Sequence, residues 1–374
     1  MRRIYLDHAA STPMLPEAFE AMRPWLEREF GNASSLHLEG RRARLALDEA
    51  RESLSEALGC LFAEVIFTGS GTEAAVLAIV GAALANRDSS RNRIILGAAE
   101  HPCVLQTSRL LEKLGYRVER VGVDRQARID LEDLQARLGP DVLLVSVMHA
   151  NNELGTLNPT STVAELAHEH GALMHADAVQ SFRALHWSVR ELGADLVSVS
   201  GHKVGGPKGV GALYVQAGVK IEPLLAGGGQ ERELRGGTEN VPAIIGFGAA
   251  VRARPLPGME ARDRFVRCLS ELSEPAWSVS SWSNVLPGHA HLRFPGHEAE
   301  TLLIRLDREG VAAGSGSACS SGSLEPSHVL LAAGYTETEA REGLRFTFGP
   351  SSTVEEAEDA ARVLASLVEG AGSP

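Results

Sequence analysis

Residues 172–203 read ALMHADAVQSFRALHWSVRELGADLVSVSGHK and contain two short apolar runs, each followed closely by polar residues. The runs Ala172–His175 and Leu196–Val199 have the length and composition of buried strands. Asp177 follows the first run and Lys203 follows the second. The carboxyl ends of parallel strands form the usual ligand-binding edge of a sheet, so we expect both residues to lie at that edge.

The same alternation of strand-like and helix-like stretches extends outward to about residues 65 and 215. Further strands are expected at Val65–Thr68, Ile94–Leu96, Val142–Val147 and Gly211–Val215. Helices are expected at Glu73–Ala85, Val104–Leu114, Leu131–Leu138 and Thr162–His170. Strands that alternate with helices predict an α/β fold with a largely parallel sheet covered on both faces.

The composition changes near Arg252–Gly258, where Arg, Pro and Gly cluster and the alternation loses its regularity. We therefore predict a large domain over residues 12–251 and a smaller α+β domain over residues 252–374, which the N-terminal segment 1–11 joins. Within the smaller domain, residues 314–323 are almost entirely Gly and Ser. Such a loop has few side chains to pack, so we expect it to be mobile.

The charge and hydropathy of the chain exclude several classes of function. Its 36 Lys and Arg residues against 48 Asp and Glu residues give a net charge of −12, without a basic run. Direct binding to nucleic acid is therefore not expected. The longest apolar helix-like run, Ala74–Ala85, is too short to cross a bilayer, and the first residues lack a secretory signal. We expect a cytoplasmic protein without a membrane span.

The chain has four cysteines, and no two of them form a CxxC pair that would indicate a disulfide framework or a zinc site. Cys60, Cys103 and Cys268 lie in apolar surroundings and are expected to be small core residues. For Cys103, a nucleophile or a metal ligand beside His101 is the alternative. Cys319 differs because it is the one reactive side chain of the Gly/Ser loop. No resident metal site is predicted.

Lysine is rare, and the chain contains only Lys113, Lys203, Lys208 and Lys220. Arg can replace Lys in most surface roles, but it cannot supply a reactive amine. Lys203 follows a strand within Ser200-Gly201-His202-Lys203, where it could form a Schiff base with a carbonyl cofactor. Lys208 is the internal rival, and a solvated loop lysine is the alternative explanation.

Three other polar positions also follow strands. Asp177 could hold a pyridine nitrogen protonated, as pyridoxal phosphate (PLP) requires, or it could cap a helix. The turn Thr68–Glu73 could bind a phosphate at the start of the next helix, although any tight strand–helix turn would look similar. His101 could stack on a ring and carry protons, or it could be an ordinary turn histidine.

Together these features resemble the cysteine desulfurases, PLP enzymes of the class-V aminotransferase group. The resemblance extends from Tyr5–Pro13 to about Gly349 and so covers nearly the whole chain. Its most specific part is Gly316–Ser327, which resembles the active-cysteine loop of the subgroup that serves general and nitrogenase-type iron–sulfur assembly. The resemblance implies PLP-dependent fold type I, with a mostly parallel mixed sheet and a smaller α+β domain.

The resemblance also assigns roles to individual residues. Lys203 corresponds to the PLP lysine, Asp177 to the partner of the pyridine nitrogen, and Gln180 to a contact of the phenolic oxygen. The phosphate contacts correspond to Gly71, Thr72, Ser200 and His202, with Thr238 reaching the phosphate of a neighbouring subunit. His101 corresponds to the histidine stacked on the ring, Asn152 to the asparagine near ring and substrate, and Arg345 to the arginine for the substrate carboxylate.

The implied reaction converts L-cysteine to L-alanine and leaves its sulfur on Cys319 as a persulfide. Lys203 is the implied base at Cα, and His101 the implied proton carrier. The resemblance implies a homodimer and a sulfur-acceptor protein, which could be a cluster scaffold or a relay for tRNA or cofactor thiolation. It also allows Cys319 to ligate an iron–sulfur cluster transiently.

Two departures and two alternatives accompany this interpretation. Val76 stands where the family often has Asn, and the chain ends at Pro374 without the extension that docks a scaffold protein in longer relatives. One alternative is another PLP reaction of class V, such as that of an aminotransferase or a kynureninase-like hydrolase. The other is a catalytically silent sulfur carrier. The combination of Lys203, Asp177 and Cys319 favours the desulfurase.

Overall fold

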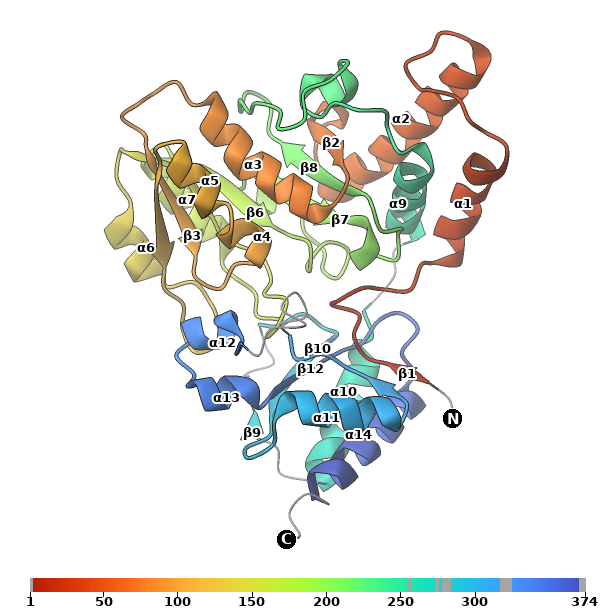
Figure 1. Ribbon diagram of the computed structural model, residues 1–374, viewed down its shortest axis with the longest axis vertical. Coiled ribbons are helices and arrows are strands. Elements are labelled where there is room, and N and C mark those ends of the chain that lie inside the picture. Colours follow the sequence, from red (N-terminus) through yellow and green to blue (C-terminus); the bar gives the residue numbers. More distant parts are fainter. Residues whose placement is uncertain (1–2, 254–256, 273–275, 278–283, 317–324, 370–374) are drawn as a thin grey trace.

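The computed structural model describes residues 3–253, 257–272, 276–277, 284–316 and 325–369. Cys319 therefore lies outside the described residues. In Figure 1 the large sheet with its helices occupies the upper part of the molecule, and a smaller group of helices and strands lies below it. The first residues of the chain, including β1 (Ile4–Tyr5), belong to the lower part.

The large sheet has seven strands in the order β2-β8-β7-β6-β5-β3-β4. Their bounds are β2 Val65–Thr68, β3 Arg93–Gly97, β4 Arg117–Val121, β5 Val142–Ser146, β6 Leu173–Asp177, β7 Leu196–Ser200 and β8 Gly211–Val215. Neighbouring strands from β7 to β4 are parallel, whereas β8 runs antiparallel to both β7 and β2. The predicted fold class, a mostly parallel mixed sheet, is confirmed.

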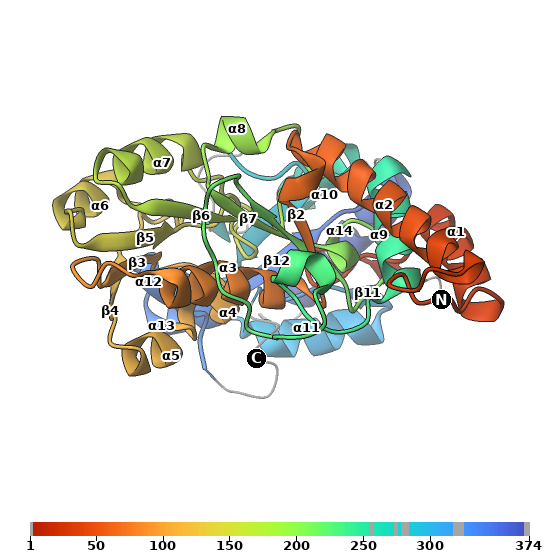
Figure 2. The ribbon, with the colours of Figure 1, turned by 90° about the horizontal axis from the view of Figure 1, so that it is seen from above.

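Helices cover both faces of this sheet, as Figure 2 shows from above. One face packs against α3 (Gly71–Ala85), with α4 (Pro102–Leu105) and α5 (Ser108–Lys113) beside it. The other face packs against α2 (Leu38–Leu58), α7 (Thr160–Glu169), α8 (Val189–Leu192) and α9 (Val241–Ala253). The sheet is therefore the middle of three layers, and burial on both sides explains its continuous apolar strands.

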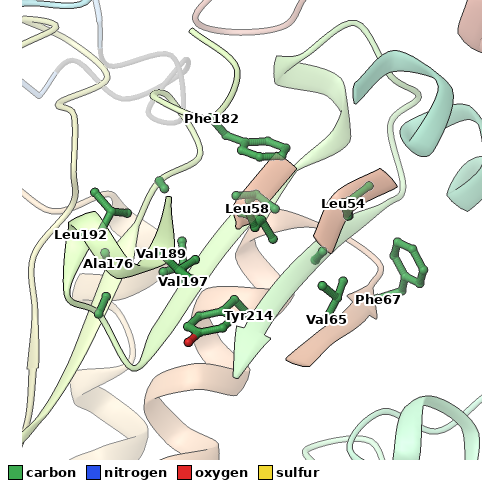
Figure 3. Packing of buried hydrophobic residues seen from close by; sticks show 14 of the residues in the cluster. Leu54, Leu58, Val65, Phe67, Ala176, Phe182, Val189, Leu192, Val197 and Tyr214 are labelled. Atoms are coloured by element: carbon green, nitrogen blue, oxygen red, sulfur yellow. The ribbon is translucent and has the colours of Figure 1, made fainter. Parts of the chain in front are cut away.

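The contact between α2 and the sheet is formed by interlocking apolar side chains. Figure 3 shows Leu54 and Leu58 near the side chains of Val65, Val197 and Tyr214. All five belong to one buried cluster. Burying a Leu side chain stabilises a fold by about 1.5–3 kcal/mol. This packing fixes α2, whose Arg44 and Arg51 form ion pairs with Glu239 and Glu231.

The lower part contains a three-stranded antiparallel sheet and three long helices. The sheet order is β12-β10-β9, with β9 Ala276–Trp277, β10 His289–Arg293 and β12 Gly343–Thr347, and a separate parallel pair joins β1 to β11 (Val311–Ala312). The helices are α10 Met259–Leu272, α11 Ala299–Arg308 and α14 Val354–Glu369. Their core includes Ile4 and Leu6 of the N-terminal segment. The proposed domain division at residue 252 stays a prediction.

The remaining helices connect the two parts or lie at their edges. They are α1 Pro16–Glu27, α6 Leu131–Arg137, α12 His328–Ala332 and α13 Glu337–Arg341. The helix expected at Val104–Leu114 is two short helices, α4 and α5. The hydroxyls of Thr107 and Ser108 donate to the carbonyl oxygens of Val104 and Leu105 at 2.6 and 2.8 Å. Such local bonds compete with continuation of a helix.

Candidate active site

A cavity of about 230 Å³ lies at the carboxyl edge of the sheet. It is lined by Ala10, Ser70, Gly71, Thr72, His101, Cys103, Met148, Ala150, Asn152, Asp177, Val179, Gln180, Ser200, His202 and Lys203. These residues follow β2, β3, β5, β6 and β7, apart from Ala10 of the N-terminal segment. The cavity thus brings together every residue predicted to hold the cofactor except Thr238.

Lys203 ends the short 3₁₀ turn Gly201–Lys203 that follows β7 directly. Its Nζ atom donates to the carbonyl oxygens of Ala9 and, at 3.1 Å, Ala10. Lys208 is exposed and does not line the cavity. The geometry therefore favours Lys203 over Lys208 as the amine that can reach a ligand in the cavity.

Asp177 ends β6 and is 7% exposed. Its Oδ1 atom accepts the backbone N–H of Val179 at 2.9 Å. Burial raises the pKa of the carboxyl group to about 6, against the opposing effects of the Val179 N–H and the Lys203 charge. A turn rather than a helix follows Asp177, so the helix-cap explanation is wrong. A buried carboxylate in a cavity is suited to bind a cationic group of a ligand.

His101 lies at the N-cap of α4, where its Nδ1 atom accepts the backbone N–H of Cys103 at 3.2 Å. Burial, together with the smaller effects of the Lys203 and His328 charges, lowers the pKa of the imidazole to about 4. The ring is therefore neutral at pH 7. Because Nδ1 accepts, the proton is carried by Nε2.

The turn between β2 and α3 has the close packing of a phosphate site. A Cβ atom at Gly71 would lie 3.0 Å from Ser200 Cβ and 3.0 Å from Val179 Cγ2, so any larger residue would have to displace these side chains. Ser70 caps α3, which is 15 residues long and presents its first N–H groups at the cavity. An anion is favoured at such a helix start.

On the β5 side of the cavity, the side-chain Oδ1 of Asn152 is buried and accepts no hydrogen bond from the described residues. Arg345, on β12, donates from Nη1 to the Asn152 carbonyl oxygen at 2.8 Å and from Nη2 to Asp7 Oδ1 at 2.7 Å. Its Nε atom is buried without a partner among the described residues. Arg345 touches a residue that lines the cavity but does not line the cavity itself.

These features together fit PLP. The cavity offers an amine that can form a Schiff base, a buried carboxylate for a pyridinium, and a helix start for a phosphate. Of the other predicted site residues, Arg345 contacts the cavity wall without lining the cavity, and Thr238 is exposed on the surface of this single chain. Cys319 falls outside the described residues.

The other cysteines differ in their surroundings. Burial and the Glu64 charge raise the pKa of Cys60 to about 12, and Cys268 is buried in the lower core. Cys268 is thus a core residue, as expected, whereas Cys60 is partly buried and packs against the edge of the larger core. Cys103 packs partly against the α3 cluster, also as expected, but it lines the cavity too. A test of which thiol receives the sulfur must therefore compare Cys103 with Cys319.

Sequence reasoning missed several buried residues beside the cavity. Glu100 is fully buried and its Oε1 atom accepts the backbone N–H of Met148. The backbone oxygen of Glu100 also accepts from His328 Nε2 at 2.9 Å. Glu153 accepts a hydrogen bond from Ser327. The only sequence signal was adjacency to His101 and Asn152, because these contacts join segments far apart in the chain.

A second cavity of about 210 Å³ adjoins the first. It is lined by residues 8–9, 12–16 and 347–351 among others, and it shares Gln180 and Lys203 with the first cavity. Lys203 thus lies between two open spaces. In the part of the chain that the structure describes, no helix is both long and apolar enough to cross a membrane.

Comparison with known proteins places these residues in context. The family model described as aminotransferase class-V matches residues 4–359. The chain is 43% identical to "Cysteine desulfurase IscS" of Dictyoglomus turgidum, over 98% of this chain and 95% of that protein. It is 42% identical to "Putative cysteine desulfurase IscS 1" of Bacillus subtilis, over 99% of each.

Solved structures give the same result. A structure titled "NIFS-LIKE PROTEIN" superposes with a TM-score of 0.90 at 31% identity, over 98% of this chain and 100% of that chain. One titled "SspA in complex with cysteine" superposes with a TM-score of 0.84 at 35% identity, over 94% of this chain and 100% of that chain. Sequence and fold point to the same group of proteins.

Proposed function

The chain belongs to the class-V aminotransferase family and, within it, to the PLP-dependent cysteine desulfurases, and from this premise we propose which of its residues carry out the reaction. L-Cysteine is converted to L-alanine, and its sulfur passes to Cys319 and then to an acceptor protein. The observation that supports this assignment best is the cavity that unites Lys203, Asp177 and His101.

PLP would be held by the residues that line the cavity. Lys203 Nζ would bind it covalently, and Asp177 would pair with its ring nitrogen. Gly71, Thr72, Ser200 and His202 would surround its phosphate, Gln180 and Asn152 would contact the ring substituents, and His101 would stack on the ring. When bound, PLP supplies an electron sink for bonds at the substrate Cα and Cβ atoms.

Proton transfer is assigned to two groups. Lys203 Nζ takes the proton from the substrate Cα, because it is the cavity's only lysine among the described residues. His101 then moves protons at its Nε2 atom, which carries hydrogen in the neutral ring. Burial keeps the imidazole of His101 neutral, and a neutral imidazole can both accept and donate a proton.

Arg345 is assigned to the substrate carboxylate. The guanidinium is held from two sides by Asp7 and by the Asn152 carbonyl oxygen, and its buried Nε–H lacks a described partner. A planar guanidinium fixed in this way has a defined orientation, which suits recognition of a carboxylate. Asn152 connects this group to the cavity.

The sulfur step is assigned to Cys319 on sequence grounds. The Cys319 thiolate attacks the substrate sulfur, an S–S bond forms, and the Cβ–S bond breaks with its electron pair left on the carbon skeleton. Protons then complete L-alanine. L-Cysteine plus the Cys319 thiol gives L-alanine plus the Cys319 persulfide, so no external oxidant or reductant is needed.

A homodimer is supported by the surface of α1, α2 and the loop between them. Phe30 and Leu36 are 86% and 90% exposed, and Leu26 and Leu45 are also exposed. A cluster of large apolar side chains on a surface indicates a protein interface. Arg44, next to Leu45, pairs with Glu239 at 3.4 Å, which brings the Thr238 turn to the same surface. We propose that a second copy of the chain covers it and receives Thr238.

The cysteines of the chain bear on the compartment and on the acceptor protein. The Cys319 thiol must stay free of disulfides in order to receive sulfur, and the cysteines follow no disulfide spacing. This supports a cytoplasmic enzyme that passes sulfur to a cluster scaffold or a thiolation relay. Cys319 could bind an iron–sulfur cluster as cargo during such a transfer.

The proposed reaction has a direct test. Protein loaded with PLP is given L-cysteine and a thiol reductant, and L-alanine, sulfide and 2-oxo acids are measured. Equal amounts of L-alanine and sulfide are expected. Formation of a 2-oxo acid instead would indicate an aminotransferase or a hydrolytic lyase and would contradict the assignment.

A further inference from the structure

The turn after β5 contains three consecutive polar residues with different tasks. Asn151 is buried, and its side-chain oxygen accepts the backbone N–H groups of Glu153 and Leu154, both at 2.9 Å. Its amide nitrogen donates to the Ala99 carbonyl oxygen at 3.2 Å. Asn151 therefore fixes the turn. Asn152 lines the cavity, whereas Glu153 contacts other segments.

Glu153 contacts the described residues on both sides of the segment that carries Cys319. On the C-terminal side, the Ser327 hydroxyl donates to Glu153 Oε2 at 2.5 Å. On the N-terminal side, Gly316 packs so closely that a Cβ atom there would lie 3.0 Å from both Cγ and Oε2 of Glu153. Gly316 also has a φ of 91°, so a glycine is required twice over.

The surroundings of Glu153 make these contacts firm. Glu153 is 1% exposed, and Ser327 is also buried. Burial raises the pKa of the Glu153 carboxyl group, against the hydrogen bond from Ser327 and the charges of His328 and Arg345. A buried hydrogen bond to an acidic group is costly to break because the separated partners stay out of water.

We propose that Glu153 is a positioning residue for sulfur transfer: it holds the two flanks of the Cys319 segment beside Asn152 and thereby sets where Cys319 can act. This inference rests on the proposed function of Cys319. Glu153 has no part in PLP binding or in proton transfer at Cα, because it does not line the cavity. It acts on the step in which the Cβ–S bond breaks and the S–S bond forms.

The inference predicts a separation of two measurable reactions. Exchange of the α-hydrogen of L-alanine with solvent deuterium requires PLP and the base, but it does not require Cys319. Arrival of sulfur on Cys319 in a single turnover requires PLP and the base, and it also requires Cys319. Displacement of a reacting group by about 1 Å can lower a rate roughly 10²-fold. Here the rate of sulfur arrival on Cys319 should fall, and the rate of α-hydrogen exchange should not.

The test uses the full-length enzyme loaded with PLP. Glu153→Ala and Ser327→Ala are expected to keep the PLP absorption band and the α-hydrogen exchange rate, and to lower sulfur arrival on Cys319 roughly 10²-fold. Glu153→Gln retains an oxygen that can accept from Ser327, so it is expected to recover most of that rate. Sulfur arrival is followed by mass spectrometry of the peptide that contains residue 319.

Matched controls separate positioning from stability. Glu64→Ala removes another buried carboxylate that accepts backbone N–H groups, those of Leu61 and Ala217. Thr336→Ala removes the N-cap of α13, as Ser327→Ala removes that of α12. Both controls should change neither reaction.

Equal losses in both reactions, or normal sulfur arrival in Glu153→Ala, would overturn the inference while leaving the proposed function in place. Absence of sulfur from Cys319 in the wild-type enzyme would contradict the proposed function itself.

Discussion

Arg345 Nη2 lies 2.7 Å from Asp7 Oδ1, so a guanidinium on β12 is paired with a carboxylate that comes from the first residues of the chain. Arg345 is 2% exposed. The pair joins the N-terminal segment to the strand that carries the proposed substrate-binding arginine. Without Asp7, the buried charge would lack a carboxylate partner among the described residues, which is costly in a protein interior.

Arg345→Lys should lower kcat/KM for L-cysteine by roughly 10–100-fold, since one ammonium cannot replace hydrogen bonds to Asp7, Asn152 and a carboxylate together. The PLP absorption band should remain. The control is Arg293→Lys, which changes an arginine of the adjacent strand β10 that pairs with Glu339. Steady-state kinetics measure both variants, and an unchanged kcat/KM in Arg345→Lys would remove Arg345 from substrate binding.

Lys203→Ala should abolish the visible absorption band of PLP bound to lysine, whereas Lys208→Ala should keep it. The reason is position, because Lys203 lines the cavity and Lys208 is exposed. Borohydride reduction followed by peptide mapping identifies the modified lysine. A reducible adduct that persists in Lys203→Ala would refute the assignment.

The stability of the cofactor-free protein should depend on pH through Asp177. Its pKa is about 6 in the fold against an ordinary value of 3.8, so the folded state binds the proton more tightly than the unfolded state. The contribution is fully present below pH 4 and is lost as the pH rises through about 6. A shift of this size corresponds to about 3 kcal/mol.

Asp177→Asn removes the buried charge, so without PLP it should unfold at a higher urea concentration than the wild type at pH 7.5. At pH 4 the two proteins should unfold at similar concentrations. The same variant should lose activity with PLP, because no carboxylate remains to pair with the ring nitrogen. A cofactor-free variant that is less stable than the wild type at pH 7.5 would contradict this account of Asp177.

Charges placed on the apolar surface of α1 and α2 should dissociate the dimer. Phe30→Asp with Leu36→Asp puts two carboxylates on the most exposed apolar positions of that surface. Sedimentation should show monomers that retain PLP poorly, because Thr238 of the partner subunit would be lost from the site. Ile304→Asp, on α11 in the lower part of Figure 1, is the control and should leave a dimer. A fully active monomer would rule out a shared site.

Much of the large sheet could be predicted from the sequence, because buried parallel strands are continuous apolar runs. Val65–Thr68 is a strand with the predicted bounds, and the other predicted runs lie on strands within one or two residues. The strand β4 was missed because Arg117, Glu119 and Arg120 give it the charged pattern of an edge. The apolar pattern thus locates central strands better than edges.

The site was predictable to a similar extent. Residues that follow central strands meet at one edge by topology, so Asp177, Lys203 and His101 could be grouped before any coordinates. The contacts of Arg345 with Asp7 and of Glu153 with Ser327 could not be predicted, because each joins segments that lie far apart in the sequence. The position of Cys103 at the cavity could not be predicted either, because the apolar pattern predicts one continuous helix where the structure has α4 and α5.

The identity of the sulfur-carrying thiol is the central claim, and Cys103 is its structural rival. Cys103 lines the cavity and lies beside His101, as an activated thiol would. Yet Cys103 belongs to α4 and packs partly against the α3 cluster, so it cannot travel from a buried substrate to an outside acceptor. One thiol must perform both tasks.

Mass spectrometry after a single turnover of L-cysteine without reductant decides between the two thiols. The account predicts one added sulfur on the peptide that contains Cys319, none on the peptide that contains Cys103, and no persulfide in Cys319→Ser. Cys103→Ser should retain the wild-type result. Sulfur found on Cys103, or near-normal sulfide release by Cys319→Ser, would contradict the account.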